Sequence, residues 1–213
     1  MVDKARASPA TTVFVVDDDE VVVRSLRWLI ESIKLPVVTF VTARDFLETY
    51  RPEQPGCLVL DVRMPGMSGI ELQEMLKQRQ WDIPVLFITG HGDVQMAVRA
   101  IKAGAFDFIE KPFNDQDMLD RIQRALAKDA ERRRTDTERI ALLRRVESLT
   151  QREREVMHLV VDGLPNKLIA DQLGLSAKTV EVHRARVMEK MGAHSISDLV
   201  KMALKEEQLR STQ

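Results

Sequence analysis

The chain has 213 residues, of which 44% are hydrophobic and 31% charged, so it can bury one large core or two small ones and is not a disordered polymer. Its formal net charge of −1 conceals an uneven distribution: residues 1–125 carry 15 Lys and Arg against 19 Asp and Glu, whereas residues 126–213 carry 17 against 14. A single cysteine, Cys57, excludes an internal disulfide. We find no signal peptide and no apolar run approaching the ~20 residues of a membrane span, so we expect a cytoplasmic protein with no membrane partner.

Short apolar runs alternate with helical patterns through the first 127 residues. Runs rich in Val, Ile and Phe are typical of strands buried on both faces of a parallel sheet. The expected strands lie at residues 12–16, 36–41, 57–60, 84–88 and 105–109. The expected helices lie at residues 21–33, 43–49 and 70–78, and a fifth is expected after Asn114. Ser68 and Glu71 have the spacing of a capping box for the helix at 70–78. This alternation predicts a doubly wound α/β domain.

The second part of the chain shows helical patterns only. Residues 128–147 are highly charged and lack Gly and Pro, which predicts a helical linker that continues the fifth helix; a short dimeric coiled coil is the alternative. Thr150 and Glu153 form a second capping-box pattern. We therefore divide the chain into a flexible N-terminus, an α/β domain, a helical linker and an all-helical domain, at residues 1–11, 12–127, 128–147 and 148–213.

Acidic, hydroxyl and ammonium groups follow four of the predicted strands. Asp17 and Asp18 follow the first, Asp61 the third, Thr89 the fourth and Lys111 the fifth. Because ligands of open α/β sheets bind at the carboxyl ends of the strands, we expect these groups to share one crevice. Clustered carboxylates call for a hard cation, and Mg²⁺ prefers oxygen ligands. We expect Asp18 and Asp61 to hold Mg²⁺, with Asp17 acting partly through water.

Such a crevice can carry phosphoryl chemistry. Asp61 can attack phosphorus as a carboxylate nucleophile and form an acyl phosphate. Lys111 would place a positive charge at the phosphoryl oxygens, and the Thr89 hydroxyl would donate a hydrogen bond to them. Each residue alone has a plainer interpretation as a helix cap, a turn residue, a strand-end hydroxyl or a surface lysine. The prediction therefore depends on their joint placement at the strand ends.

A short helix, a tight turn and a longer helix predict a helix-turn-helix over residues 166–191. In the longer helix Val180, Val187, Met188 and Met191 recur as a stripe that should be buried, so the opposite face should enter the major groove of DNA. The candidate DNA-contacting residues are Asn166, Lys167, Ser176, Lys178, Thr179, Val182, His183, Arg186 and Lys190. The alternative is a helical interaction module with charged solvent faces, which the two glutamates on the outer face favour.

Four segments resemble the motifs of receiver domains of two-component response regulators, which have a flavodoxin-like fold with a five-stranded parallel sheet. These segments are Val15–Asp18, Leu60–Gly69, Ile88–Gly90 and Lys111–Phe113. The resemblance implies that Asp61 is the phosphoacceptor. It further implies that Asp18, Asp61 and the backbone carbonyl of Arg63 bind Mg²⁺, with Asp17 supporting the ion through water.

The same resemblance implies a conformational switch. The peptide bond before Pro112 should be cis, and Phe108 should be the switch aromatic, at a position where Tyr is commoner. In the family this ring rotates inward when the hydroxyl corresponding to Thr89 moves toward the phosphoryl group.

Three further segments resemble the LuxR/FixJ-type DNA-binding domain, at residues 149–156, 163–170 and 176–184. Together the two resemblances point to the FixJ-like regulators and not to an enzyme. They imply phosphorylation of Asp61 by a sensor histidine kinase, a homodimer when phosphorylated, binding to promoter DNA and recruitment of RNA polymerase by an activator. Two other classes remain open. One is a Mg²⁺-dependent phosphohydrolase, although Arg63 stands where its general acid would be, and the other is an adaptor that binds no nucleic acid.

Overall fold

The computed structural model describes residues 10–90 and 94–211, and it divides into two compact units with the boundary between Arg133 and Arg134. The flexible N-terminus predicted for residues 1–11 lies almost wholly outside the described residues. Among the described residues, no helix is long and apolar enough to cross a bilayer. Each unit is described separately below.

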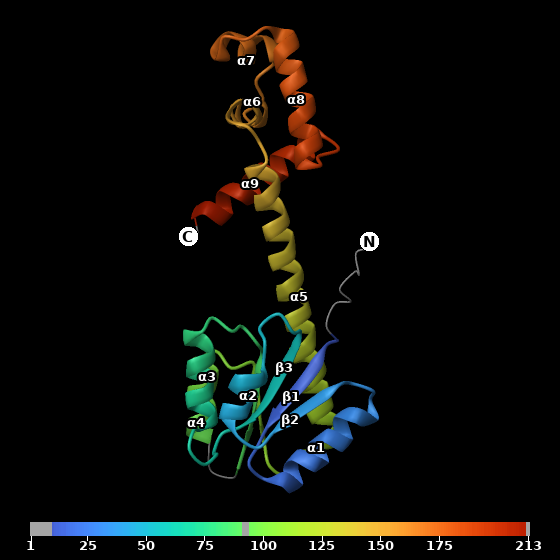
Figure 1. The fold of residues 1–213 in the computed structure, drawn as a ribbon, viewed down its shortest axis with the longest axis vertical. Coiled ribbons are helices and arrows are strands. Elements are labelled where there is room, and N and C mark those ends of the chain that lie inside the picture. The colour runs from blue at the N-terminus through green and yellow to red at the C-terminus, as the bar shows by residue number, and fades with distance from the viewer. Residues whose placement is uncertain (1–9, 91–93, 212–213) are drawn as a thin grey trace. The chain divides into compact units, whose positions relative to one another are not determined.

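The first unit alternates strands and helices (Figure 1). Its strands are β1 (Thr12–Val16), β2 (Val37–Phe40), β3 (Gly56–Asp61), β4 (Val85–Thr89) and β5 (Asp107–Glu110). Its helices are α1 (Glu20–Ser32), α2 (Ala43–Thr49), α3 (Gly69–Gln78), α4 (Val94–Lys102) and the first part of α5 (Asp115–Glu147). All neighbouring strands pair in parallel in the order β2-β1-β3-β4-β5. This is the predicted doubly wound α/β fold.

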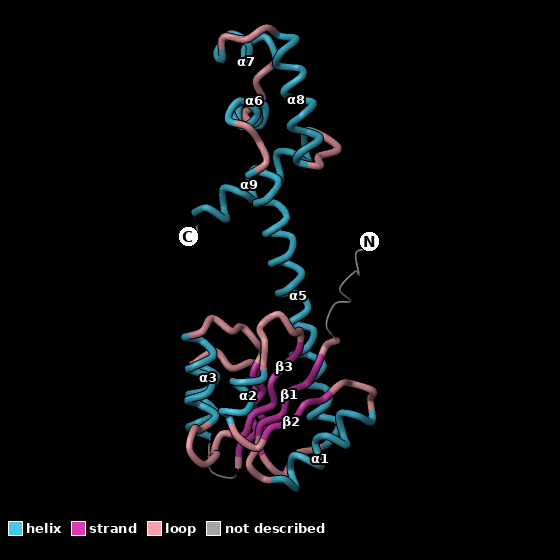
Figure 2. The backbone as a smooth tube through the Cα atoms, in the orientation of Figure 1, coloured by secondary structure: helices cyan, strands magenta, loops and turns pink. Residues whose placement is uncertain are grey.

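Helices cover both faces of this sheet (Figure 2). Alternate strand residues point to opposite faces, so Phe14 packs with α2 and α3, whereas Val13 and Val15 pack with α1 and α5. β1, β3 and β4 are buried along their whole length, as expected for strands covered on both faces. The sheet therefore presents its strand ends, not its faces, as the accessible surface for chemistry.

The second unit is all helical, as predicted. It contains the end of α5 and the helices α6 (Gln151–Val161), α7 (Asn166–Leu173), α8 (Ala177–Met191) and α9 (Ile196–Ser211). Leu142 and Val146, from the end of α5, lie in the same hydrophobic core as Val180 and Val187 of α8. Residues at the end of the predicted linker thus help to form the core of the helical unit.

Local sequence signals account for most of the element boundaries. Both capping boxes are confirmed, at Ser68 with Glu71 and at Thr150 with Glu153. Several bounds differ from the prediction by one residue, as in β2, β3, β4 and α1. β5 differs at both ends: it spans Asp107–Glu110 against the expected 105–109, because its ladder with β4 runs from the pair Leu86 and Asp107 to the pair Thr89 and Glu110. The last helix, α9, continues to Ser211, since no Gly or Pro follows Leu204 to end it.

Candidate functional site

Two buried carboxylates lie at the centre of the sheet edge. Asp17 directly follows β1, and Asp61 ends the neighbouring strand β3, where the strand order reverses. This reversal is the place where open α/β sheets bind ligands. Asp17 is 1% exposed and Asp61 is 7% exposed. The sheet thus brings together two of the acids that the sequence predicted to meet.

Lys111 connects the two acids. Its Nζ lies 2.8 Å from Asp17 Oδ2 and 2.7 Å from Asp61 Oδ1. The lysine follows β5 and precedes Pro112 across the predicted cis peptide bond, which is confirmed. The remaining carboxylate oxygens accept backbone hydrogen bonds: Asp61 Oδ2 from the N–H of Arg63 at 2.6 Å, and Asp17 Oδ1 from the N–H of Asp19 at 2.9 Å. Both carboxylates are therefore held in one orientation before any ligand arrives.

The charges in this pocket oppose one another. Burial raises the pKa of Asp17, as does the like charge of Asp61, and the hydrogen bonds from Lys111 and Asp19 only partly offset these effects. Burial by itself would lower the pKa of Lys111, but its hydrogen bonds and attraction to Asp17 and Asp61 outweigh burial and raise it. The positive charge of Lys111 therefore partly balances the two carboxylates even before a metal ion or phosphate binds.

These two acids, together with Asp18, Arg63 and Gly90, line a pocket of about 250 Å³. Over the described ranges, no three His, Cys, Asp or Glu side chains are grouped as a complete metal-binding cluster. Mg²⁺ does not require such a group, because it keeps several waters and is commonly held by one or two carboxylates. The oxygen donors lining this pocket therefore fit Mg²⁺, and a doubly charged ion would relieve the repulsion between Asp17 and Asp61.

The two predicted switch residues lie on the neighbouring strands β4 and β5. Thr89 ends β4 and is 3% exposed, and its hydroxyl donates to the carbonyl of Gly90 at 3.1 Å. Phe108, on β5, is half-buried against the core on the α2–α4 face. A Thr89 hydroxyl that already has a backbone acceptor must rotate before it can meet a phosphoryl oxygen.

A close contact between Gly69 and the backbone of Asp61, which the sequence analysis missed, helps to fix the position of Asp61. A Cβ atom on Gly69, the first residue of α3, would lie 2.1 Å from the carbonyl oxygen of Asp61, so only glycine fits there. The N–H of Gly69 also donates to the carbonyl of Val62 at 3.1 Å. The start of α3 thus packs directly on the backbone that carries Asp61. The glycine following a capping serine was the available signal.

The second candidate site is the outer face of α8. Val180, Val187 and Met191 are buried, as the stripe predicted, and Met188 is half-buried. The opposite face is exposed, including Val182 at 46%. Of the other candidates, Lys167, Ser176, Lys178 and Arg186 are exposed, while Asn166, Thr179 and His183 are partly buried. The helix therefore presents a surface of mixed charge to solvent, with Lys178 and Arg186 exposed beside Glu181 and Glu189 and the apolar Val182 between them.

Two long side chains near this face make contacts within the unit. Lys190 Nζ donates to Glu153 Oε2 at 2.6 Å and to the carbonyl of Ser148 at 3.0 Å, so its predicted DNA contact competes with an internal ion pair. Arg184, which lies nearer the apolar stripe, donates to Asn166 Oδ1 at 2.7 Å and joins α8 to α7. Sequence spacing gave no signal for either contact.

The family models agree with this division into two sites. The response regulator receiver domain matches residues 13–123, and the luxR family of bacterial regulatory proteins matches residues 147–203. The chain belongs to the response regulators that join a receiver domain to a LuxR-type DNA-binding domain, and so to the transcriptional regulators of two-component systems.

Relatives match almost the whole chain. Nodulation protein W of Bradyrhizobium diazoefficiens is 47% identical over 92% of this chain and 87% of its own length. The transcriptional regulatory protein FixJ of Azorhizobium caulinodans is 47% identical over 90% of this chain and 91% of its own length. Among solved structures, the response regulator StyR is 51% identical with a TM-score of 0.88, covering 93% of this chain and all of that one. Full-length FixJ from B. japonicum is 41% identical with a TM-score of 0.58, covering 94% and 98%.

Proposed function

We propose that this chain is a transcriptional activator whose DNA binding is controlled by phosphorylation of Asp61 by a sensor histidine kinase. The observation that carries the proposal is the bridge from Lys111 Nζ to both Asp17 and Asp61, 2.8 and 2.7 Å away, within one solvent-accessible pocket. An ammonium group fixed at that place can hold a phosphoryl oxygen once Asp61 carries the phosphate.

The transfer step follows from the carboxylate's position. An oxygen of Asp61 attacks phosphorus, the P–N bond of the kinase phosphohistidine breaks, and the imidazole nitrogen leaves with the electron pair. Lys111 then exchanges its bond to Asp61 for a phosphoryl oxygen. Asp17, Asp18, Asp61 and the carbonyl of Arg63 are the groups that would hold Mg²⁺, which, when bound, screens the negative charges as they approach. The N–H of Arg63 keeps Asp61 oriented throughout.

The response to phosphorylation is assigned to Thr89 and Phe108. Rotation of the Thr89 hydroxyl from the Gly90 carbonyl toward the phosphoryl group would open space into which the half-buried Phe108 ring can turn. The altered surface would then favour a homodimer.

On DNA, the proposed contacts come from α7 and α8. A dimer would present two copies of α8 to two half-sites and recruit RNA polymerase. Lys178 and Arg186 can reach phosphates or guanine edges, and Val182 can meet a thymine methyl group. Asn166, Lys167, Ser176, Thr179 and His183 complete the proposed surface. Lys190 joins it only if its bond to Glu153 opens.

The test is labelling by acetyl phosphate, in which the P–O bond breaks and acetate leaves. Wild-type protein should take up one Mg²⁺-dependent, acid-labile phosphoryl group and bind its selected genomic DNA fragment more tightly afterwards. Asp61→Asn should abolish the label and the change in DNA affinity, because an amide does not replace the nucleophilic carboxylate. A label that persists in Asp61→Asn would move the phosphoacceptor elsewhere, and repeated turnover to free phosphate would favour the phosphohydrolase.

A further inference from the structure

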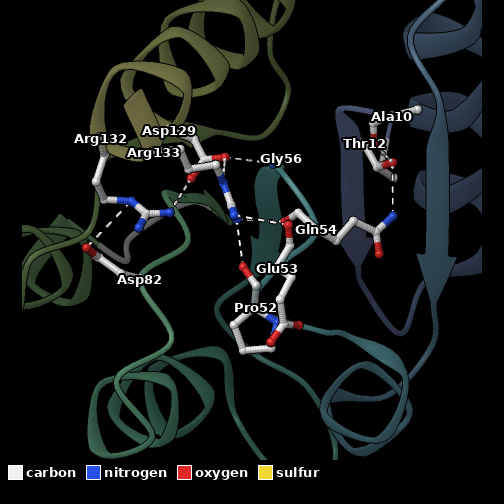
Figure 3. A network of polar contacts seen from close by, with 10 residues as sticks. All are labelled: Ala10, Thr12, Pro52, Glu53, Gln54, Gly56, Asp82, Asp129, Arg132 and Arg133. Atoms are coloured by element: carbon white, nitrogen blue, oxygen red, sulfur yellow. Dashed lines mark hydrogen bonds and ion pairs between the residues drawn. The ribbon is translucent and has the colours of Figure 1, made fainter. Parts of the chain in front are cut away.

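A buried carboxylate on α5 lies within the receiver unit but beyond residue 123, where the receiver family model ends. Asp129 is 1% exposed. Its Oδ2 accepts from the backbone N–H of Gly56 at 3.0 Å and from Arg133 Nε at 2.7 Å, and its Oδ1 accepts from Arg132 Nη2 at 2.6 Å (Figure 3). Three donors thus satisfy the two oxygens of this buried carboxylate, two of them from guanidinium groups.

Arg133 extends these contacts to the segment that precedes β3. It donates to the backbone carbonyls of Pro52 at 2.8 Å, Glu53 at 3.1 Å and Gln54 at 2.8 Å (Figure 3). Arg132 also lies 3.6 Å from Asp82, which precedes β4. We call Asp129, Arg132, Arg133 and the carbonyls of residues 52–54 the Asp129 cluster. It binds α5 to the loop that enters β3.

The cluster is placed where α5 stops packing on the receiver. Asp129 is the last buried residue of α5 in the receiver unit, and the next buried residue along the helix is Leu142, which belongs to the core of the helical unit. Residues 134–138 between them are all exposed. Helical segments without a packed face are marginally stable in water. Leu126 packs on the receiver core and Lys128 Nζ lies 5.4 Å from the centre of the Phe106 ring, so the Asp129 cluster supplies the last contacts that hold α5 on the receiver.

The cluster is also tied to the phosphorylation site through one strand. β3 begins at Gly56, whose N–H is bound by Asp129, and ends at Asp61. A Cβ atom on Gly56 would lie 2.0 Å from the carbonyl oxygen of Thr12, so the start of this strand is held closely against β1 as well. The strand that carries the proposed phosphoacceptor is thus anchored at its opposite end to the root of the connecting helix.

We infer that the Asp129 cluster fixes α5 to the receiver and is required for phosphorylation to alter DNA binding. If the cluster is broken, α5 loses order back to about Leu126, the last residue before it that packs on the receiver core. The connection between the domains then becomes a longer flexible segment, which transmits no orientation. This inference rests on the proposed function, but its structural half can be measured without DNA.

The experiment uses the full-length chain with Arg133→Gln, and Arg134→Gln as the matched control on the next, exposed position. Asp129→Asn is the second variant, since it keeps an acceptor for Gly56 but removes the charge. Hydrogen exchange of residues 126–133 reports order in α5, and DNA affinity with and without acetyl phosphate reports coupling. We expect Arg133→Gln and Asp129→Asn to be labelled at the wild-type rate and to exchange faster at residues 126–133. In the wild type phosphorylation should raise DNA affinity about fivefold or more, and in both variants this increase should be lost. Arg134→Gln should behave as wild type.

Unchanged exchange at residues 126–133 in both variants, or an intact phosphorylation effect despite faster exchange, would overturn the inference. If phosphorylation does not change the DNA affinity of the wild-type protein, the proposed function is contradicted instead. The exchange data would still decide whether the cluster holds α5 on the receiver.

Discussion

Each domain of this protein buries a carboxylate beside a lysine, and the two pairs behave oppositely. Asp17 and Lys111 are 2.8 Å apart in the receiver, and Glu153 and Lys190 are 2.6 Å apart in the helical domain. Burial raises the pKa of Asp17, whereas the hydrogen bonds from Lys190 and from the backbone of Thr150 lower the pKa of Glu153 to about 2.

The difference comes from how many acids share the lysine. Lys111 pairs with both Asp17 and Asp61, so one ammonium group balances two carboxylates. Over residues 10–90 and 94–211, Glu153 is the one carboxylate with which Lys190 forms an ion pair, and Glu153 also completes a capping box. Two carboxylates that share one lysine can bind a further cation, although their mutual repulsion lowers the stability of the receiver. The pair of Glu153 and Lys190 instead stabilises the helical domain.

Removing the charge of Asp17 gives the largest expected effect. In Asp17→Asn, Mg²⁺-dependent labelling by acetyl phosphate should slow about 10- to 100-fold, because a supporting group of the metal site is lost. The receiver should unfold at the same or a higher temperature, because a buried charge beside Asp61 is removed. Both tryptophans, Trp28 and Trp81, lie in the receiver unit, so their fluorescence reports its unfolding.

Asp120→Asn, at an exposed position of α5, removes the same charge and should change neither quantity. A normal labelling rate in Asp17→Asn, or a clear loss of receiver stability, would remove the contrast between the two pairs.

Glu153→Gln should act on stability and should do so in a pH-dependent way. Its folded pKa of about 2 lies below the unfolded value of 4.5, so the ion pair contributes fully above pH 4.5 and is lost as the pH falls toward 2. At pH 7 the substitution should cost the helical domain about 1–2 kcal/mol. The cost should shrink as the pH is lowered below 4.5.

Thermal unfolding followed by circular dichroism measures this cost, and tryptophan fluorescence of the receiver serves as the internal control. A cost that stays constant from pH 7 to 3 would show that Glu153 acts through packing and not through charge.

Lys178→Ala has the smallest expected effect, and it compares an exposed lysine of α8 with Lys190, which is paired with Glu153. Lys178 is exposed on α8, so its removal should weaken binding of the selected DNA fragment by about 1 kcal/mol and reduce the slope of log K against log salt by about 0.9, without changing stability. Lys190→Ala should instead destabilise the helical domain. If Lys190→Ala lowers the salt slope while stability is unchanged, Lys190 contacts DNA and its pairing with Glu153 is incidental.

Local patterns in the sequence determined most of the fold. Short apolar runs located the strands, and helical apolar spacing and capping boxes located the helices, because those signals act between residues close in the chain. Parallel alternation then implied that Asp17, Asp61 and Lys111 would meet at one edge, which the sheet confirms.

Only the tertiary structure decided the contacts between distant segments. The pairing of Lys190 with Glu153 and the bond from Gly56 to Asp129, 73 positions away, follow no local pattern. A charged residue in a helix has the same sequence signature whether it meets solvent, DNA or a buried partner. Its role is fixed only when packing removes water from around it and leaves one partner within reach.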